Sequence, residues 1–304
     1  MVTHSLAELD GYAVDLGGTK LAAVSFERGE IQNILVRPTR SADGPATLVR
    51  DLAQISKDIG YKPGASIGVA VAGKLDAQGL WSSVNHAILK NLSKLPLSEC
   101  LSEVLGAGVV ALNDTQAAAI GEYRFGAGKG ASSLAYLTVS TGVSAGFVLN
   151  GHALRSANGM LGHVGAMTST KGSGSCGCGR VGTYESIASG RAMEAIARSL
   201  GHGELDCHQI FAARSAGEVW AQQIVEDACA SIAELCANLT AILGVERVVL
   251  GGGVGLADGF LDTVKRHLSA EPAQFQPEIV SPLLGKHSAM YGVLSSAMAN
   301  GAAS

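Results

Sequence analysis

The chain has 304 residues, of which 47% are hydrophobic and 16% are charged, and its formal net charge is −4 at pH 7. A chain of this length can bury a large core and usually forms two domains, and so few charges exclude long disordered tracts. The slightly acidic balance argues against a nucleic-acid partner, because such a surface needs clustered lysine and arginine.

The N-terminal part of the chain shows no targeting or membrane-spanning signal. Residues 1–12 lack the basic flank and the apolar core of a signal peptide, and the apolar run 65–73 is far too short to cross a membrane. Six cysteines in a chain of this size also differ from a secreted disulfide scaffold. We therefore expect a cytoplasmic protein without a membrane partner.

Short apolar runs and helical periodicity alternate along the first part of the chain. In chain order, strands are expected at residues 12–14, 21–26, 31–36, 66–72 and 109–112. Leu48, Leu52, Ile55 and Ile59 fall on one face of a helix, and another helix is expected to start near Thr115.

The second part of the chain continues this alternation. Strands are expected at residues 134–138, 147–149 and 247–250. Apolar residues at helical spacing predict one long helix over 219–243, in which Cys229 and Cys236 are small core residues. Helices are expected to follow the glycine run 251–253 to the end. Alternating strands and helices are typical of an α/β fold.

Two similar strand–turn–strand units suggest duplicated halves that face each other across a cleft. We place the boundary near Gln116. The smaller domain is then 1–116, to which a C-terminal helix at about 287–304 crosses back, and the larger domain is 117–286.

The turn from Asp15 to Lys20 is the first candidate site. Gly17 and Gly18 let backbone amides and the Thr19 hydroxyl approach phosphate oxygens, while Asp15 makes sense through a bridging Mg²⁺ or water. An ordinary tight turn would explain the glycines equally well. A second polar turn, 140–146, favours the phosphate interpretation, because two such hairpins can hold one triphosphate between them.

Two further motifs follow strand ends. Gly251–Gly255 follows a strand and is expected to open a helix; it lacks the full dinucleotide spacing and suits a flat nucleoside, with close packing as the alternative. Asn113-Asp114 stands where α/β proteins place catalytic side chains, and a carboxylate there can accept a proton during phosphoryl transfer. The alternative is that Asp114 merely caps the next helix.

The segment 159–191 combines a histidine, a Cys-x-Cys pair and a glutamate. His163, Cys176 and Cys178 have the chemistry of zinc ligands, but no convincing fourth ligand accompanies them. Glu185 comes just before an expected helix. The residues alone leave both a metal site and a polar substrate site open.

Taken together, these motifs occur in the order found in the ROK family of sugar kinases, which the chain resembles from about residue 11 to residue 299. The motifs are Asp15-Leu-Gly-Gly-Thr-Lys20, Asn113-Asp114 before Gln-Ala-Ala-Ala, the Ser-Thr-Gly turn, Cys176-Gly-Cys-Gly and Gly251-Gly-Gly-Val-Gly255. The resemblance implies an actin-like ATPase fold, in which two ribonuclease-H-like domains surround a cleft. Thr138–Val143, Gly162-His163, Glu185–Arg191 and Val254–Asp258 further resemble a bacterial subgroup that phosphorylates N-acetylmannosamine.

The resemblance implies ATP-dependent phosphorylation of a sugar 6-hydroxyl during sialic acid breakdown, with ATP and Mg²⁺ as cofactors. By resemblance, Asp114 is the catalytic base. The sugar-binding residues are Gly73, Asn85, Asn113, His163 and Glu185. The ATP and Mg²⁺ site is formed by Asp15, Gly17, Gly18, Thr19, Lys20, Thr141, Gly142, Gly252 and Gly253. A homodimer is expected because dimers are common in the family.

The chain departs from the family pattern at its zinc loop. His163 falls at a sugar-binding position, Ala166 replaces the zinc histidine, and Thr183 replaces the third cysteine. Tight structural zinc sites use four ligands, so Cys176 and Cys178 are expected to be remnants and zinc is expected to be absent. For His163, the alternative to sugar contact is a hydrogen bond within its loop.

A second departure lies in the second hairpin, where Ser144 and Ala145 replace a Gly-Gly pair. A Cβ there could crowd the γ-phosphate or forbid a positive φ, but both side chains are small, and we expect altered rather than lost activity.

Three other functions compete with this interpretation. A kinase for glucose or N-acetylglucosamine would share the chemistry and differ in the pocket around the sugar 2-substituent. A ROK repressor would carry a DNA-binding segment ahead of the first hairpin, for which residues 1–12 leave no room. A non-catalytic sugar sensor is disfavoured by Asp15, Lys20 and Asp114.

Overall fold

The computed structural model describes residues 5–85 and 89–301. Its first sheet has the order β3-β2-β1-β4-β8. These strands are β1 (Gly11–Leu16), β2 (Lys20–Glu27), β3 (Glu30–Pro38), β4 (Ile67–Val71) and β8 (Val109–Asn113). β1 to β3 form an antiparallel meander, and β4 and β8 continue the sheet in parallel from β1. Every residue of β4 is buried, as expected of a central parallel strand covered on both faces.

The second sheet repeats this order as β11-β10-β9-β12-β13. Its strands are β9 (Ser133–Val139), β10 (Val143–Leu149), β11 (His152–Ala153), β12 (Arg247–Gly251) and β13 (Glu278–Val280). The shared order confirms the expected α/β duplication. The expectation that only helices follow β12 was wrong, because β13 pairs in parallel with β12. A strand of three residues is too short to show the two-residue alternation by which strands are predicted.

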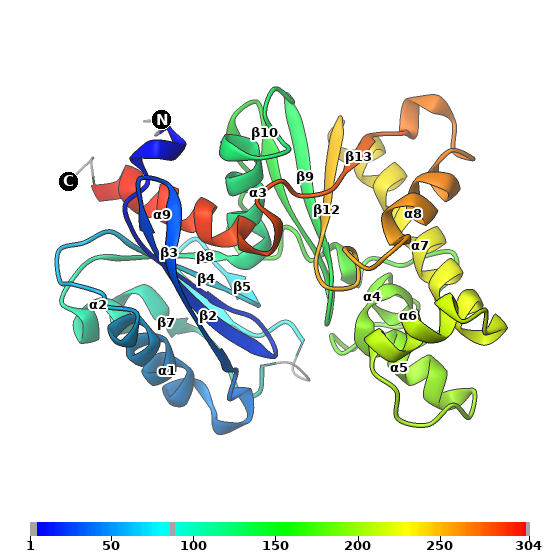
Figure 1. Cartoon of the computed structure of the whole chain (residues 1–304), viewed down its shortest axis with the longest axis horizontal. Helices are drawn as coiled ribbons and strands as arrows, with labels where there is room; N and C mark the ends of the chain where they lie inside the picture. The colour runs from blue at the N-terminus through cyan, green and yellow to red at the C-terminus, as the bar shows by residue number, and fades with distance from the viewer. Residues whose placement is uncertain (1–4, 86–88, 302–304) are drawn as a thin grey trace.

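The helices lie in three layers around the two sheets (Figure 1). α1 (Pro45–Asp58) and α2 (Leu97–Leu105) cover the outer face of the first sheet. The outer face of the second sheet is covered by α4 (Glu185–Ala188), α5 (Gly190–Ser199), α6 (Cys207–Ser215), α7 (Val219–Leu243) and α8 (Phe260–Leu268). α7 has the bounds that its periodicity predicts, and Cys229 and Cys236 are fully buried in it.

Two helices lie between the sheets. α3 (Asp114–Phe125) packs on β9 and β10, while α9 (Ser288–Gly301) returns from the C-terminal part of the chain to pack on β1, β4 and β8. The two helices cross closely at Gly292, where a Cβ would lie 1.8 Å from the Ala117 carbonyl oxygen. The predicted boundary near Gln116 falls inside α3. The division into two domains stays a prediction, and residues 302–304 of the expected helix lie outside the described residues.

A buried carboxylate ties α3 to the loop before α9. Glu122 is fully buried and accepts hydrogen bonds from the backbone N–H groups of Ala127, Leu283 and Leu284 at 2.7, 3.1 and 2.9 Å. The Ser288 hydroxyl donates to the same carboxylate at 2.7 Å. The loop 283–288 is therefore held at a fixed position beside α3.

A small third sheet lies beside the first one and consists of β5 (Lys74–Leu75), β6 (Leu80–Ser82) and β7 (Leu95–Pro96). Within 5–85 and 89–301, no helix combines the length and the apolar character needed to cross a bilayer.

Candidate active site

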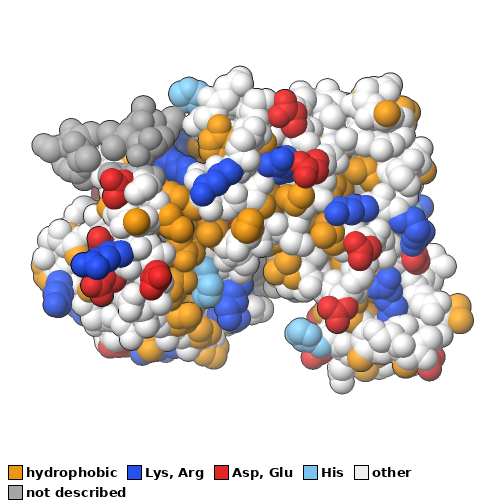
Figure 2. All heavy atoms as spheres, turned by 45° about the horizontal axis from the view of Figure 1, so that its top comes forward, with side chains coloured by type: hydrophobic (Ala, Val, Ile, Leu, Met, Phe, Trp, Pro, Cys, Tyr) orange, Lys and Arg blue, Asp and Glu red, His pale blue; other side chains and the backbone are white. Residues whose placement is uncertain are grey.

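A cavity of about 460 Å³ lies between the turns of the two long hairpins and collects the residues singled out in the sequence. On the face drawn in Figure 2, the surface is notched between the two halves of the molecule. The predicted residues that line the cavity are Asp15, Gly17, Gly18, Thr19, Lys20, Gly73, Asn85, Asn113, Asp114, Thr141, Gly142, His163, Glu185, Gly252 and Gly253. Ala166, Cys176 and Cys178 also line it, whereas Thr183 is fully buried behind it.

Asn113 and Asp114 stand where β8 ends and α3 begins. Asn113 caps the helix, since its Oδ1 accepts from the Gln116 N–H at 3.1 Å, and its Nδ2 donates to the Gly73 carbonyl at 2.8 Å. The Asp114 carboxylate accepts a bond from the Thr115 N–H at 2.8 Å and is also hydrogen-bonded by its own backbone N–H and by the Asn113 side chain. Capping by Asn113 leaves the Asp114 carboxylate available to the cavity.

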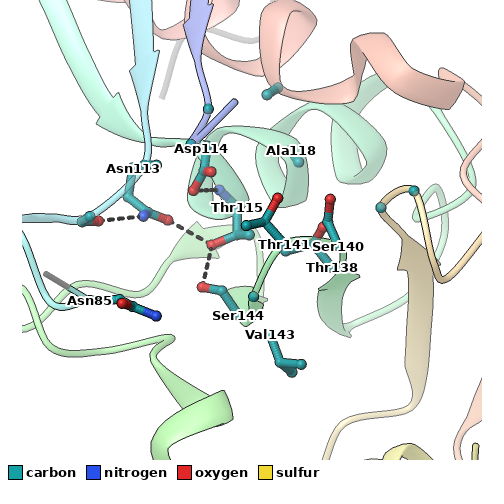
Figure 3. Close-up of a pocket in the computed structure, with 18 of the residues that line it drawn as sticks. Asn85, Asn113, Asp114, Thr115, Ala118, Thr138, Ser140, Thr141, Val143 and Ser144 are labelled. Carbon is teal, nitrogen blue, oxygen red and sulfur yellow. Dashed lines mark hydrogen bonds between the residues drawn. The ribbon is translucent and has the colours of Figure 1, made fainter. Parts of the chain in front are cut away.

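Ser144 connects the second hairpin to this corner (Figure 3). Its Oγ lies 3.1 Å from Thr115 Oγ1, which in turn donates to Asn113 Oδ1 at 2.7 Å. Ser144 and Ala145 belong to β10, and neither has a positive φ. The expected conflict with backbone conformation therefore does not arise, because these positions lie in the strand and not in the turn.

Asp15 and Asp114 form an acidic pair at the cavity wall. Burial, with the charge of Asp114 as a second cause, raises the pKa of Asp15 to about 7, although Lys20 opposes the shift. Burial also raises the pKa of Asp114 to about 6. Asp15 Oδ1 is buried without a hydrogen-bond partner among the described residues. A carboxylate oxygen in that situation fits a Mg²⁺ ligand.

Three residues of this cavity carry no signal in the sequence. Lys286 is exposed on the short 3₁₀ helix Gly285–His287 before α9 and lines the cavity, as does Lys20 of the first hairpin. Tyr136, on β9, and Ser288 line it as well, and burial strongly raises the pKa of Tyr136. Tyr136 alternates with apolar residues like any core residue, and Lys286 follows an ordinary loop glycine. Only the crossing of α9 brings that lysine to the site.

His163 lines the cavity, just before the short 3₁₀ turn Val164–Ala166. Burial and, to a smaller degree, the charge of Lys74 lower its pKa to about 4. The imidazole is therefore neutral near pH 7. The ring is hydrogen-bonded to the Gly159 backbone within its own loop, and its other nitrogen can accept a bond from an uncharged hydroxyl group.

Glu185 begins α4 and is held by donors from three parts of the chain. Asn85 Nδ2 donates to its Oε1 at 2.8 Å, the Val143 N–H donates to its Oε2 at 3.2 Å, and the Cys176 thiol lies 3.6 Å from Oε1. These contacts join residues that are up to 100 positions apart in the sequence.

The residues of this loop do not fit a four-ligand zinc site. Ala166 and Thr183 supply neither an imidazole nor a thiolate, and burial raises the pKa of the Cys176 thiol to about 11. Within the described part of the chain, no group of three or more histidine, cysteine, aspartate or glutamate side chains could hold a metal ion.

Gly252 and Gly253 follow β12 and line the cavity. Gly252 has a φ of +87°, and a Cβ there would lie 2.4 Å from the Val139 carbonyl oxygen. The expectation that this glycine run opens a helix was wrong: turns occupy 252–259, and α8 begins only at Phe260. An adjoining hollow is lined by Gly253, Arg191 and Phe211 and offers space for a flat group.

The ROK family model matches residues 11–300. The bifunctional enzyme NanE/NanK of Brucella melitensis is 38% identical over 283 residues, which cover 92% of this chain and 52% of that protein. The N-acetylmannosamine kinase of Shigella boydii is 35% identical over 88% of this chain and 91% of its own length. This chain spans about half the length of the first of these relatives.

Among solved structures, the ROK hexokinase of Thermus thermophilus superposes with a TM-score of 0.78 at 31% identity, covering 97% of this chain and all of that one. The two like-ordered sheets and this neighbour confirm the actin-like fold that the resemblance implies.

Proposed function

The chain belongs to the ROK family, and from that premise we propose that it transfers the terminal phosphoryl group of ATP to the 6-hydroxyl of N-acetylmannosamine. The observation that carries the proposal is the placement of Asp114 in one cavity with both glycine hairpins. The identity of 35% to a relative named N-acetylmannosamine kinase supports the choice of sugar.

Asp114 acts as the general base. As the sugar O6 forms its bond to the γ-phosphorus and the bond to the ADP oxygen breaks, the hydroxyl proton passes to the Asp114 carboxylate. A pKa of about 6 makes this carboxylate a stronger base than an ordinary aspartate, while it is still mostly ionised at neutral pH.

The sugar lies against Asn113, neutral His163 and Glu185, with Gly73 and Asn85 at the edge of its site. These side chains offer both donors and acceptors to hydroxyl groups. The bond from Asn113 to the Gly73 carbonyl keeps that part of the wall rigid.

ATP lies between the two hairpins. Gly17, Gly18, Thr19, Thr141 and Gly142 present backbone amides and hydroxyls to the phosphates, and Lys20 and Lys286 supply positive charge. Asp15 would hold Mg²⁺, which when bound neutralises charge that develops on the phosphate oxygens. The nucleoside lies against Gly252 and Gly253, the second of which also lines the adjoining hollow.

A panel of sugars in a coupled ADP-release assay tests the proposal. The panel contains N-acetylmannosamine, N-acetylglucosamine, glucose and mannose, and N-acetylmannosamine should give the highest kcat/KM. Preference for glucose would instead support the same chemistry on another hexose, in keeping with the hexokinase neighbour. Sugar binding without ADP release would support a non-catalytic sensor and would overturn the proposed reaction.

A homodimer and a cytoplasmic location belong to the proposal as well. Sedimentation velocity on the purified chain would test the dimer, and fractionation of the source cells would test the location.

A further inference from the structure

The cysteine loop touches the sugar site at one point, which is the Cys176 thiol. Cys176 is 8% exposed, and its Sγ lies 3.6 Å from Glu185 Oε1. The sulfur is itself held by two donors, since the Cys178 N–H donates to it at 3.2 Å and the Thr183 hydroxyl bonds to it. The Cys176 thiol donates to Glu185 Oε1, and a second side-chain hydrogen bond joins it to Cys178.

Glu185 needs such donors, because a carboxylate at a cavity wall adopts a single orientation only when its oxygens are bonded. Oε2 receives the Val143 N–H, and Oε1 receives Asn85 and Cys176. Thr183, which replaces a family zinc ligand, serves here as a partner of Cys176. The departures from the zinc pattern thus coincide with a set of direct hydrogen bonds.

The backbone of the same loop also fixes Asn85. A Cβ on Gly177 would lie 2.1 Å from Asn85 Oδ1, so that the loop and the Asn85 side chain are in close contact. Both Oε1 donors of Glu185 are therefore positioned by residues 176–177.

We infer that residues Cys176–Cys178 act as a metal-free clamp, in which the protonated Cys176 thiol is a positioning residue for the sugar-binding Glu185. This inference rests on the proposed function, because its measurements use phosphorylation of N-acetylmannosamine. It assigns unequal roles to the two cysteines, whereas a zinc site would need both.

Three variants distinguish a metal-free clamp from a zinc site: Cys176→Ala, Cys176→Ser and Cys178→Ala. Loss of one hydrogen bond to a charged group should raise the KM for N-acetylmannosamine about fivefold to tenfold in Cys176→Ala, with kcat and the KM for ATP within about twofold. Cys176→Ser retains a donor and should restore KM to within about threefold of wild type. Cys178→Ala keeps the backbone N–H that bonds Cys176 and removes only the side-chain hydrogen bond between the two cysteines, so its KM should rise clearly less than that of Cys176→Ala.

If Cys176→Ala does not fold, a second pair of variants tests the clamp. Gly177→Ala should displace Asn85 and raise the sugar KM, while Gly174→Ala is the matched control in the same loop, with its nearest atom at 3.7 Å. Equal sugar KM values in the two glycine variants would overturn the inference.

Treatment with a zinc-selective chelator, with Mg²⁺ in excess, should leave the sugar KM unchanged. Equal losses in Cys176→Ala and Cys178→Ala, together with zinc-restored activity after chelation, would overturn the inference in favour of a metal site. Wild-type protein without activity on any sugar of the panel would contradict the proposed function, whereas active wild type with an unaffected Cys176→Ala contradicts the clamp alone.

Discussion

Asn113 and Asp114 have separate roles: Asn113 caps α3, and Asp114 presents its carboxylate to the cavity. Because Asn113 caps α3 and binds Gly73, Asp114 keeps a carboxylate with a raised pKa at the cavity wall. The sequence placed this pair at a strand end but left capping by Asp114 as an alternative. Which of two adjacent polar residues caps depends on backbone angles that the sequence does not show.

Asp114→Asn should lower kcat by about 10²- to 10⁴-fold and leave the KM for the sugar within about threefold, since only the proton acceptor is removed. Steady-state kinetics in the coupled assay measures both constants. Asp262→Asn, on the exposed face of α8, is the matched control and should behave as wild type. Near-normal turnover by Asp114→Asn would remove Asp114 from the role of base.

Asp15 makes stability depend on pH. Its pKa of about 7 in the folded chain exceeds its ordinary value of 3.8, so the folded state binds more protons between these values. The free energy of unfolding therefore falls as pH rises through this window. Without Mg²⁺, Asp15→Asn should melt several degrees above wild type near pH 8, and the difference should shrink as pH falls toward about 5. A pH-independent difference in Tm would contradict the assignment.

Lys286 adds a cation that the sequence did not reveal. Lys286→Met should raise the KM for ATP about tenfold, because a charge-assisted contact to a phosphate is lost, and should leave the sugar KM unchanged. Lys286→Arg should retain most of the affinity. Lys265→Met, at an exposed position of α8, provides the control. A larger effect on the sugar KM than on the ATP KM would contradict a contact between Lys286 and the ATP phosphates.

At the scale of elements, periodicity predicted the long apolar elements well and the short ones poorly. The bounds of α7 agree with its apolar spacing, and β4 and β12 lie within one residue of their predicted runs. β13 and the turns at 252–259 were not foreseen, because three residues show no period and a glycine run is compatible with a turn or a helix start. The signal comes from repetition, which short elements lack.

The crossing of α3 and α9 depends on small residues. Gly292→Ala should destabilise the fold by about 1–3 kcal/mol, because its Cβ would overlap the Ala117 carbonyl. Urea unfolding would measure the loss. Gly108→Ala meets no atom within 4 Å and should be close to neutral. Equal stability of the two variants would show that the helices separate without cost.

At the scale of the molecule, the sequence predicted duplicated halves and one shared cleft, and the sheets have the same strand order. All the predicted site residues line one cavity. The contact between Cys176 and Glu185 and the arrival of Lys286 were not predictable, since each depends on how distant segments pack. Local sequence patterns carry no record of such packing.

Because both halves line the cavity, its ligands should stabilise the chain as a unit. At about 100 times its Kd, N-acetylmannosamine should add about 2.7 kcal/mol to the free energy of unfolding and raise the Tm of a single transition. A non-hydrolysable ATP analogue with Mg²⁺ should add a further increase. Two separate transitions, of which only one responds to the sugar, would contradict a shared site.

The return of α9 to β1 and β4 also affects the order in which the protein can be completed during translation. The strands of the first sheet are synthesised before α9, the helix that covers their inner face. The apolar inner face of this sheet, with Ala13, Val24 and Ala70, must wait for Val293 and Leu294. A nascent chain that stalls before residue 288 therefore displays that face to chaperones and proteases. The exposed sheet face thus distinguishes an incomplete polypeptide from the folded protein.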